Sequence, residues 1–190
     1  GVFILGASYY SKIYIANNLF LNGNGNSSYK ILWLRGEGAN TYMVYNNTFI
    51  NCTYPLGPSS SNTCRAINNL FKGCSNIGSG ATLASGSGYN ATDSSSFSYT
   101  VTGGSVGDRT SQTFTFVDES GGDYHLASTD AGAKDYGTSL SGDSYYPFSN
   151  DIDNETRSGT WDIGADEYVA SGGGVVLPIF MAYYRRRRMV

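Results

Sequence analysis

The chain alternates between short apolar stretches and polar turns. Alternation of apolar and polar residues predicts β-strands at 12–15, 30–34, 42–44 and 113–117. The strands at 12–15 and 42–44 run into an Asn-Asn pair, and a second short apolar stretch follows at once. Because Asn tolerates left-handed backbone, the pair is predicted to be a tight corner between two strands.

This corner recurs along the chain. Segments 15–23, 44–52 and 66–74 align without gaps on the pattern apolar–x–Asn–Asn–x–Phe, and their starts lie 29 and then 22 residues apart. A period of this size is typical of one coil of a three-faced solenoid, whose coils must stack to bury their apolar faces. Stacking predicts two columns with one residue per coil, about 4.8 Å apart. These structural columns are Asn17, Asn46 and Asn68, and Phe20, Phe49 and Phe71.

The pattern therefore predicts an all-β chain with stacked parallel strands. We expect parallel β-helix coils over 1–78, a loop-rich final coil over 79–112, an irregular C-terminal β cap over 113–170, and a Gly linker with a hydrophobic, Arg-rich tail over 171–190. An antiparallel sandwich of short strands would share the turn-rich composition. A sandwich does not require the same residue at the same corner, however, so the recurrence favours the solenoid.

The later segments add a resemblance. Residues 114–118, 122–126 and 161–168, with Asp151-Ile152-Asp153 and Arg157 between them, resemble the end of bacterial extracellular β-helix proteins of the choice-of-anchor type. The Asn corners are similar to those of right-handed parallel β-helices with the pectate-lyase-like fold. The resemblance implies a right-handed β-helix. It also implies that the chain is exported by a bacterium and displayed at the cell surface. It implies no particular activity, because the family carries no single one.

Charge divides the chain into three zones. Residues 1–78 carry five basic residues and one acid, and residues 79–170 carry three basic residues and fourteen acids. The last twenty residues carry four Arg and no acid. The net charge of −3 argues against a nucleic-acid partner. A polysaccharide lyase needs carboxylates for Ca²⁺ with a nearby basic residue, and a glycosidase needs two facing acids. The coils offer only Glu37, so no catalytic residue is expected unless the acidic cap folds back over them.

The coils instead carry aromatic and cationic side chains that could stack on sugar rings or receive an acidic glycan. The candidate glycan-binding residues are Tyr14, Trp33, Arg35, Tyr42, Tyr45 and Arg65. Equally, Tyr suits any half-exposed strand. The sequence favours a non-catalytic, glycan-binding, adhesive or structural surface protein. The alternatives are the C-terminal part of a polysaccharide lyase or epimerase whose catalytic coils lie upstream, and a trimeric, phage tail-spike-like receptor-binding part.

The cap holds a candidate Ca²⁺ site at Asp151, Asp153 and Glu155, whose alternating oxygen ligands lack the central Gly and distant Glu of a full Ca²⁺ loop. The same acids could be solvated turn residues. No other cofactor is indicated, and His125, the single histidine, has no telling partner in the sequence and is expected to be structural.

Cys52 and Cys74 occupy the same repeat position, which predicts two stacked buried thiols, or a disulfide if the corner brings their Cβ atoms into range. Cys64 lies outside this pattern, and the three cysteines cannot all pair within one chain.

The tail resembles bacterial Gly-Gly sorting tails. Glycines at 172–174 precede an apolar run at 175–184 and a candidate membrane anchor of Arg185, Arg186, Arg187 and Arg188. Such arginines stay on the cytoplasmic side and hold the preceding domain outside. The run would rise only about 15 Å as a helix against a hydrocarbon core of about 30 Å. A peripheral anchor and a disordered basic end therefore remain open for this segment.

Overall fold

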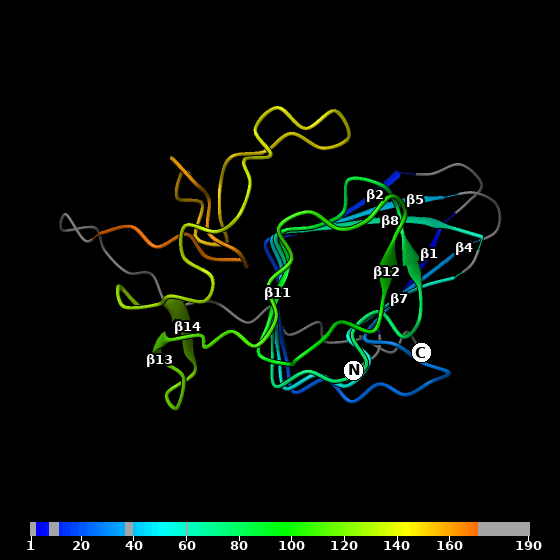
Figure 1. Cartoon of the computed structure of the whole chain (residues 1–190), viewed down its shortest axis with the longest axis horizontal. Coiled ribbons are helices and arrows are strands. Elements are labelled where there is room, and N and C mark those ends of the chain that lie inside the picture. The colour runs from blue at the N-terminus through cyan, green and yellow to red at the C-terminus, as the bar shows by residue number, and fades with distance from the viewer. Residues whose placement is uncertain (1–2, 8–11, 37–39, 60, 171–190) are drawn as a thin grey trace, which may run out of the picture.

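The computed structural model describes residues 3–7, 12–36, 40–59 and 61–170. These residues form fourteen strands and no helix (Figure 1). Four sheets are entirely parallel, and the three larger ones have the strand orders β1-β4-β7, β2-β5-β8 and β11-β9-β6-β3. The prediction of an all-β chain with parallel sheets is therefore confirmed, and the arrangement is compatible with a solenoid.

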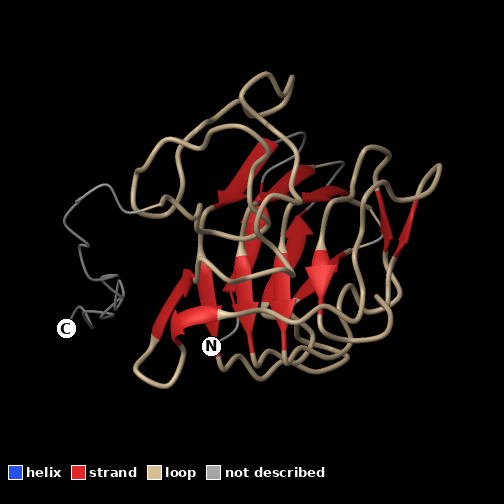
Figure 2. Ribbon diagram, turned by 60° about the vertical axis from the view of Figure 1, so that its left-hand side comes forward, coloured by secondary structure: helices blue, strands red, loops and turns tan. Residues whose placement is uncertain are grey.

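The first nine strands form three rungs, each with one strand in each of the three larger sheets. The first rung is β1 (Phe3–Ala7), β2 (Lys12–Ala16) and β3 (Leu19–Leu21); the second is β4 (Leu32–Gly36), β5 (Thr41–Tyr45) and β6 (Thr48–Ile50); the third is β7 (Leu56–Pro58), β8 (Thr63–Ile67) and β9 (Leu70–Lys72). Equivalent strands of successive rungs pair without a register shift. Figure 2 shows these strands side by side.

Residues 79–112, expected to form one loop-rich coil, contribute two shorter rungs. They contain β10 (Thr82–Leu83), β11 (Ala91–Thr92) and β12 (Thr100–Val101), with β10 parallel to β12 and β11 parallel to β9. Isolated parallel bridges join Gly88 to Ile67 on one side and to Val106 on the other. The repeat thus continues past the last Asn-Asn pair.

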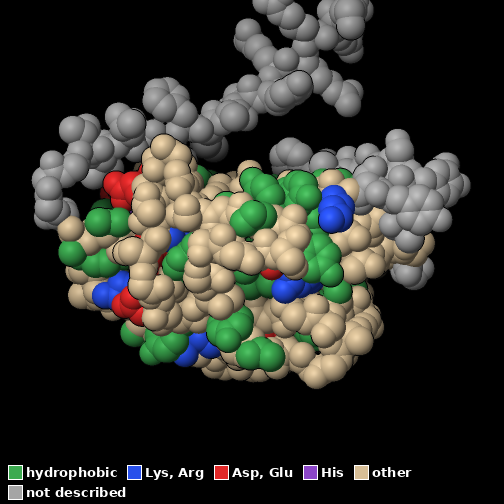
Figure 3. Space-filling view, turned by 90° about the horizontal axis from the view of Figure 1, so that it is seen from above, with side chains coloured by type: hydrophobic (Ala, Val, Ile, Leu, Met, Phe, Trp, Pro, Cys, Tyr) green, Lys and Arg blue, Asp and Glu red, His purple; other side chains and the backbone are tan. Residues whose placement is uncertain are grey.

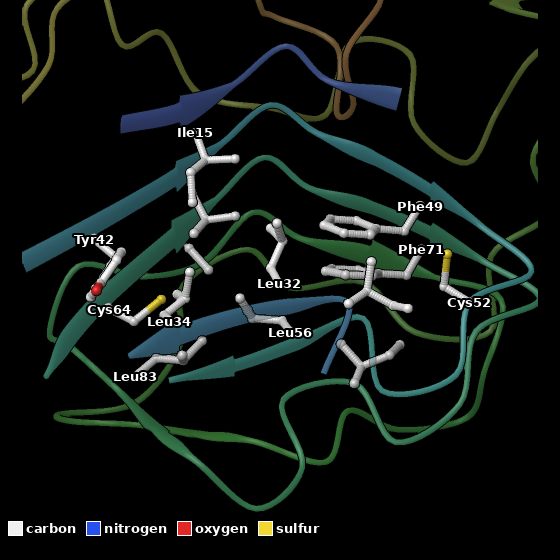
Figure 4. Packing of buried hydrophobic residues seen from close by; sticks show 14 of the residues in the cluster. Ile15, Leu32, Leu34, Tyr42, Phe49, Cys52, Leu56, Cys64, Phe71 and Leu83 are labelled. Atoms are coloured by element: carbon white, nitrogen blue, oxygen red, sulfur yellow. The ribbon is translucent and has the colours of Figure 1, made fainter. Parts of the chain in front are cut away.

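The interior is a continuous apolar core with an aromatic column. The rings of Phe20 and Phe49 stack at 4.7 Å between centroids, and those of Phe49 and Phe71 at 4.9 Å. These spacings match the distance between paired strands, because each ring sits at the same register position of its rung. Figure 4 shows Phe49 and Phe71 parallel to each other within the core.

Each corner between the second and third strand of a rung begins with a residue in left-handed conformation. These residues are Asn17, Asn46, Asn68, Tyr89 and Gly107, with φ between 47° and 70°. The residue that follows carries an amide or carboxylate. We call the second set the ladder: Asn18, Asn47, Asn69, Asn90 and Asp108.

The ladder residues bond to one another across the rungs. Nδ2 of Asn18, Asn47 and Asn69 donates to Oδ1 of the next ladder residue at 2.9–3.0 Å. Their backbone N–H groups donate to the same oxygens at 3.0–3.1 Å. Asn90 bonds to Asp108 in the same way, at 2.9 and 3.2 Å. Asp108 ends the ladder, because it lacks the side-chain amide N–H that each Asn donates to the next ladder residue.

The sequence predicts a column of Asn17, Asn46 and Asn68, and these residues occupy equivalent corner positions, but the hydrogen-bonded ladder is formed by the residue after each of them. Within this set a single side-chain bond is made, from Asn68 Nδ2 to Asn46 Oδ1 at 3.1 Å. The left-handed first residue of the corner directs its side chain toward the cap, whereas the ladder residue that follows faces the neighbouring rungs. Asn46 Nδ2 donates outward to the carbonyls of Asp162 and Gly164, both at 3.1 Å.

Residues 113–170, which we call the cap, cover the side of the rungs and not their end (Figure 1). The cap begins with an antiparallel pair, β13 (Phe116–Asp118) and β14 (Asp123–Leu126), and continues as irregular loops. It packs on outward-facing side chains of two sheets. One cluster joins Ile50 and Leu70 to Phe114, Leu126 and Ile163, and the other joins Met43, Tyr45 and Ile67 to Leu140 and Trp161. The acidic cap therefore does fold back over the coils.

Arg157 fixes the cap at its centre. Its fully buried side chain pairs with Glu167 at 3.2 Å and donates to the carbonyls of Gly164 and Ala165 at 3.1 and 2.7 Å. It also reaches the first rung, where Nη2 donates to Asn17 Oδ1 at 3.1 Å. Burial lowers the pKa of Arg157, although the charge of Glu167 opposes this effect. One guanidinium thus joins the terminal run of the cap to an Asn corner.

Candidate functional site

An aromatic patch lies where the cap meets the outward face of the sheet β2-β5-β8. It consists of Tyr14 from β2 with Tyr145 and Tyr146 from the cap. Tyr14 stacks on Tyr146 with 4.4 Å between ring centroids. Tyr14 and Tyr145 are each 41% exposed, so their rings are available at the surface. Figure 3 views the molecule from above, with hydrophobic side chains beside Lys and Arg.

Charged groups surround the aromatic patch. Lys12 Nζ lies 5.8 Å and the Arg65 guanidinium 4.9 Å from the centre of the Tyr145 ring. Arg65 also pairs with Asp143 of the cap at 2.7 Å and donates to Tyr45 Oη at 2.8 Å. The patch can therefore offer stacking surface and polar groups together.

Asp143 holds this part of the cap in place. Its Oδ1 accepts the backbone N–H groups of Tyr145 and Tyr146, both at 2.9 Å. Burial alone would raise the pKa of Asp143, but the bond from Arg65 and those two amides hold it below the ordinary value.

We predict that this anchorage is lost in acid. An acid whose pKa is lowered by folding stabilises the folded state above its unfolded pKa, about 3.9, and this contribution disappears as the pH falls through the folded value. At pH values below about 4, the Tyr145 and Tyr146 amides should therefore be less protected from hydrogen exchange. Asp143→Asn should show reduced protection already at pH 7, with a loss of about 1–2 kcal/mol. Equal protection in both proteins at pH 7 would contradict the assignment.

The six glycan-binding candidates from the sequence do not form one surface. Tyr14 and Arg65 belong to the aromatic patch or border it. Trp33 and Arg35 lie on a different sheet, on β4, where the guanidinium stacks 4.2 Å from the Trp33 ring centre. The prediction that Tyr42 and Tyr45 bind glycan is wrong, because both side chains are fully buried. Tyr42 lies in the interior core, and the cap covers Tyr45.

Sequence reasoning missed Tyr145, Tyr146 and Asp143. The acidic, turn-rich stretch that contains them shows no periodicity. The adjacent pair of tyrosines in that stretch was a usable signal, since a polar loop seldom needs two neighbouring aromatic rings.

The prediction of a Ca²⁺ site at Asp151, Asp153 and Glu155 is also corrected, because the three side chains do not converge. Asp151 is buried, and its oxygens accept the backbone N–H groups of Asp153, Glu155 and Glu167 at 2.8–3.1 Å. Asp151 therefore shapes the turn. Glu155 is exposed, and Asp153 turns instead toward His125.

His125 is surrounded by carboxylates. Its Nδ1 lies 2.5 Å from Asp123 Oδ1, and its Nε2 lies 2.8 Å from Asp153 Oδ2. Burial alone would lower the pKa of His125, but the bond with Asp123, the charge of Asp166 and the contact with Asp153 raise it to about 9. Burial in turn raises the pKa of Asp166 to about 7. Sequence reasoning treated this histidine as lacking a partner, because its partners lie up to 41 residues away.

The cysteines are buried free thiols. Cys52 and Cys74 lie at equivalent positions of neighbouring rungs, next to the bridged pair Thr53 and Ser75. Each thiol donates to a backbone carbonyl, Cys52 Sγ to that of Ile50 at 3.3 Å and Cys74 Sγ to that of Phe49 at 3.4 Å. Figure 4 shows Cys52 beside the aromatic column, and burial raises the pKa of the more distant Cys64 to about 12.

The predicted sorting tail, with Arg185 to Arg188, lies outside the described residues. Within the described ranges, no helix is long and apolar enough to cross a bilayer.

No protein-family model, curated protein or solved structure matches this chain. Its function must therefore be argued from its own residues.

Proposed function

We propose that this chain is a non-catalytic glycan-binding segment of a right-handed parallel β-helix, displayed at a bacterial cell surface. The aromatic patch of Tyr14, Tyr145 and Tyr146 is the observation that carries the binding proposal. Flat faces of sugar rings pack on aromatic side chains, and exposed tyrosines bring a hydroxyl for hydrogen bonding as well. Lys12, exposed beside the patch, favours glycans that contain uronic acids, because these carry carboxylates.

The surroundings of the patch favour binding over catalysis. Where cap acids reach the coils, they pair with cations: Asp143 with Arg65, and Glu119 with Lys72. Asp143 is a poor general acid or base, since its ion pair with Arg65 holds its pKa low. The stacked parallel rungs support the β-helix proposal, and the resemblance of residues 161–168 to surface-displayed proteins supports the location.

A binding measurement tests the function. Residues 1–170 should bind oligosaccharides of galacturonate on a glycan array, and Tyr145→Ala should weaken that binding about tenfold, because one stacking surface is lost. Tyr136→Ala is the matched control, since Tyr136 is 43% exposed and stacks with Arg109 instead of the patch. An array without binding, or equal losses in both variants, would refute the proposal.

A further inference from the structure

We propose that His125, Asp153 and Asp166 form a binding site for a divalent transition-metal cation, with Zn²⁺ as the best match. One ligand atom from each residue lies within 4.8 Å of the others. The three come from separate parts of the cap: β14, the turn at 151–155, and the terminal run 161–168. An imidazole nitrogen with two carboxylate oxygens is a donor set that suits Zn²⁺ and its neighbours in the first transition row.

The orientation of the histidine ring supports the assignment independently of the two acidic ligands. Nδ1 of His125 bonds to Asp123 Oδ1, and the same oxygen accepts the backbone N–H of His125 at 3.1 Å. A metal-binding histidine commonly donates its other ring N–H to a carboxylate, which fixes the tautomer and aims the free nitrogen at the metal. Asp123 would hold His125 in this way and leave Nε2 facing Asp153.

The carboxylates are also positioned. Asp166 is buried, and its Oδ2 accepts the backbone N–H of Leu126 at 2.7 Å, so the residue after His125 fixes the second acid. Three carboxylates around one imidazole make the cluster acidic, which favours a divalent cation.

The ligand atoms span up to 4.8 Å and would have to shift by about 1 Å to bind one ion. Two ligands bound to Zn²⁺ at 2.0–2.2 Å stand roughly 3–3.5 Å apart, and His125 Nε2 is already 2.8 Å from Asp153 Oδ2. This site differs from the Ca²⁺ loop expected at 151–155. It shares only Asp153 with that loop, and its nitrogen ligand disfavours Ca²⁺, which takes oxygen ligands. A bound ion would connect three chain segments and so secure the cap.

The single histidine permits a direct test in the unmodified chain. Zn²⁺ should bind at a 1:1 ratio and shift the imidazole resonances of His125 in NMR spectra, and EDTA should reverse both effects. A hundredfold excess over Kd should raise Tm by about 5 °C or more, because the ion binds only the folded cap. Imidazole resonances that stay unmoved at millimolar Zn²⁺ would overturn the proposal, even if Zn²⁺ binds elsewhere. An equal response to Ca²⁺ would overturn the choice of metal class.

Variants separate the ligands from their neighbours. Asp153→Asn should weaken Zn²⁺ binding at least tenfold, and Asp123→Asn about tenfold through the ring orientation. Glu155→Gln is the matched control, because it removes an exposed acid from the same turn without touching the trio. Unchanged affinity in Asp153→Asn, or an equal loss in Glu155→Gln, would contradict the site. If Asp153→Asn fails to fold, the NMR titration of the unmodified chain decides.

Discussion

Replacing Asn69 with alanine should destabilise the protein by about 3–5 kcal/mol. Asn69 is fully buried, and its Nδ2 donates to the carbonyls of Val44 and Ile67 and to Asn90 Oδ1, at 2.8–3.2 Å. Its Oδ1 accepts two bonds from Asn47, both at 3.0 Å. Alanine would leave these buried groups unpaired, and each unpaired group costs about 1–3 kcal/mol before relaxation. Urea unfolding followed by circular dichroism measures the loss.

Asn18→Ala is the matched control for this prediction. Asn18 has the same ladder position in the first rung, but its side chain is exposed and its backbone N–H still donates to Asn47 Oδ1 after the change. We expect a loss below about 1 kcal/mol, because water can replace the missing bonds. If both variants lose the same free energy of unfolding, the corner conformation and not the ladder determines stability. If Asn69→Ala loses less than about 1 kcal/mol, the ladder carries little free energy.

The rungs could be predicted because their signal repeats. Strand pairing in register places like residues above one another, so the Asn-Asn-x-Phe recurrence carries the topology in three successive segments. Recurrence could not predict which Asn of each pair forms the ladder and which contacts the cap, since both residues recur equally. The backbone of the corner, left-handed at the first Asn, decides which side chain faces inward. The last two corners were missed because Tyr89 and Gly107 replace the first Asn, while Asn90 and Asp108 keep the ladder.

The cap was harder to predict because it docks without periodicity. It attaches through the first Asn of the corners: Asn17 donates to the carbonyl of Asn150 at 2.6 Å, and Asn68 to that of Thr138 at 2.8 Å. Backbone carbonyls carry no sequence signature, so the loops that provide them look like ordinary polar turns. The aromatic patch and the His125 cluster both depend on cap residues brought there by this docking. Their positions therefore needed the folded chain.

Arg157→Met should detach the cap from the rungs, at a cost of about 3–5 kcal/mol. The change removes the charge that pairs with buried Glu167 and the donor that satisfies the carbonyls of Gly164 and Ala165. Removal of one partner from a buried ion pair leaves an uncompensated charge, which is strongly destabilising. Met keeps most of the aliphatic volume, so the loss reports the guanidinium and not a cavity. Hydrogen exchange should accelerate across 113–170 more than in the ladder.

Arg109→Met provides the comparison for Arg157→Met. Arg109 is only partly buried, stacks on Tyr136 and donates to the carbonyl of Gly132 at 3.3 Å, so its loss should cost less than about 1 kcal/mol. The double variant Arg157→Met with Glu167→Gln should recover part of the loss, because it removes the unpaired charge. Uniform acceleration of exchange over rungs and cap would show that both unfold as one unit. In that case Arg157 would stabilise the whole fold, and the cap could not be released separately.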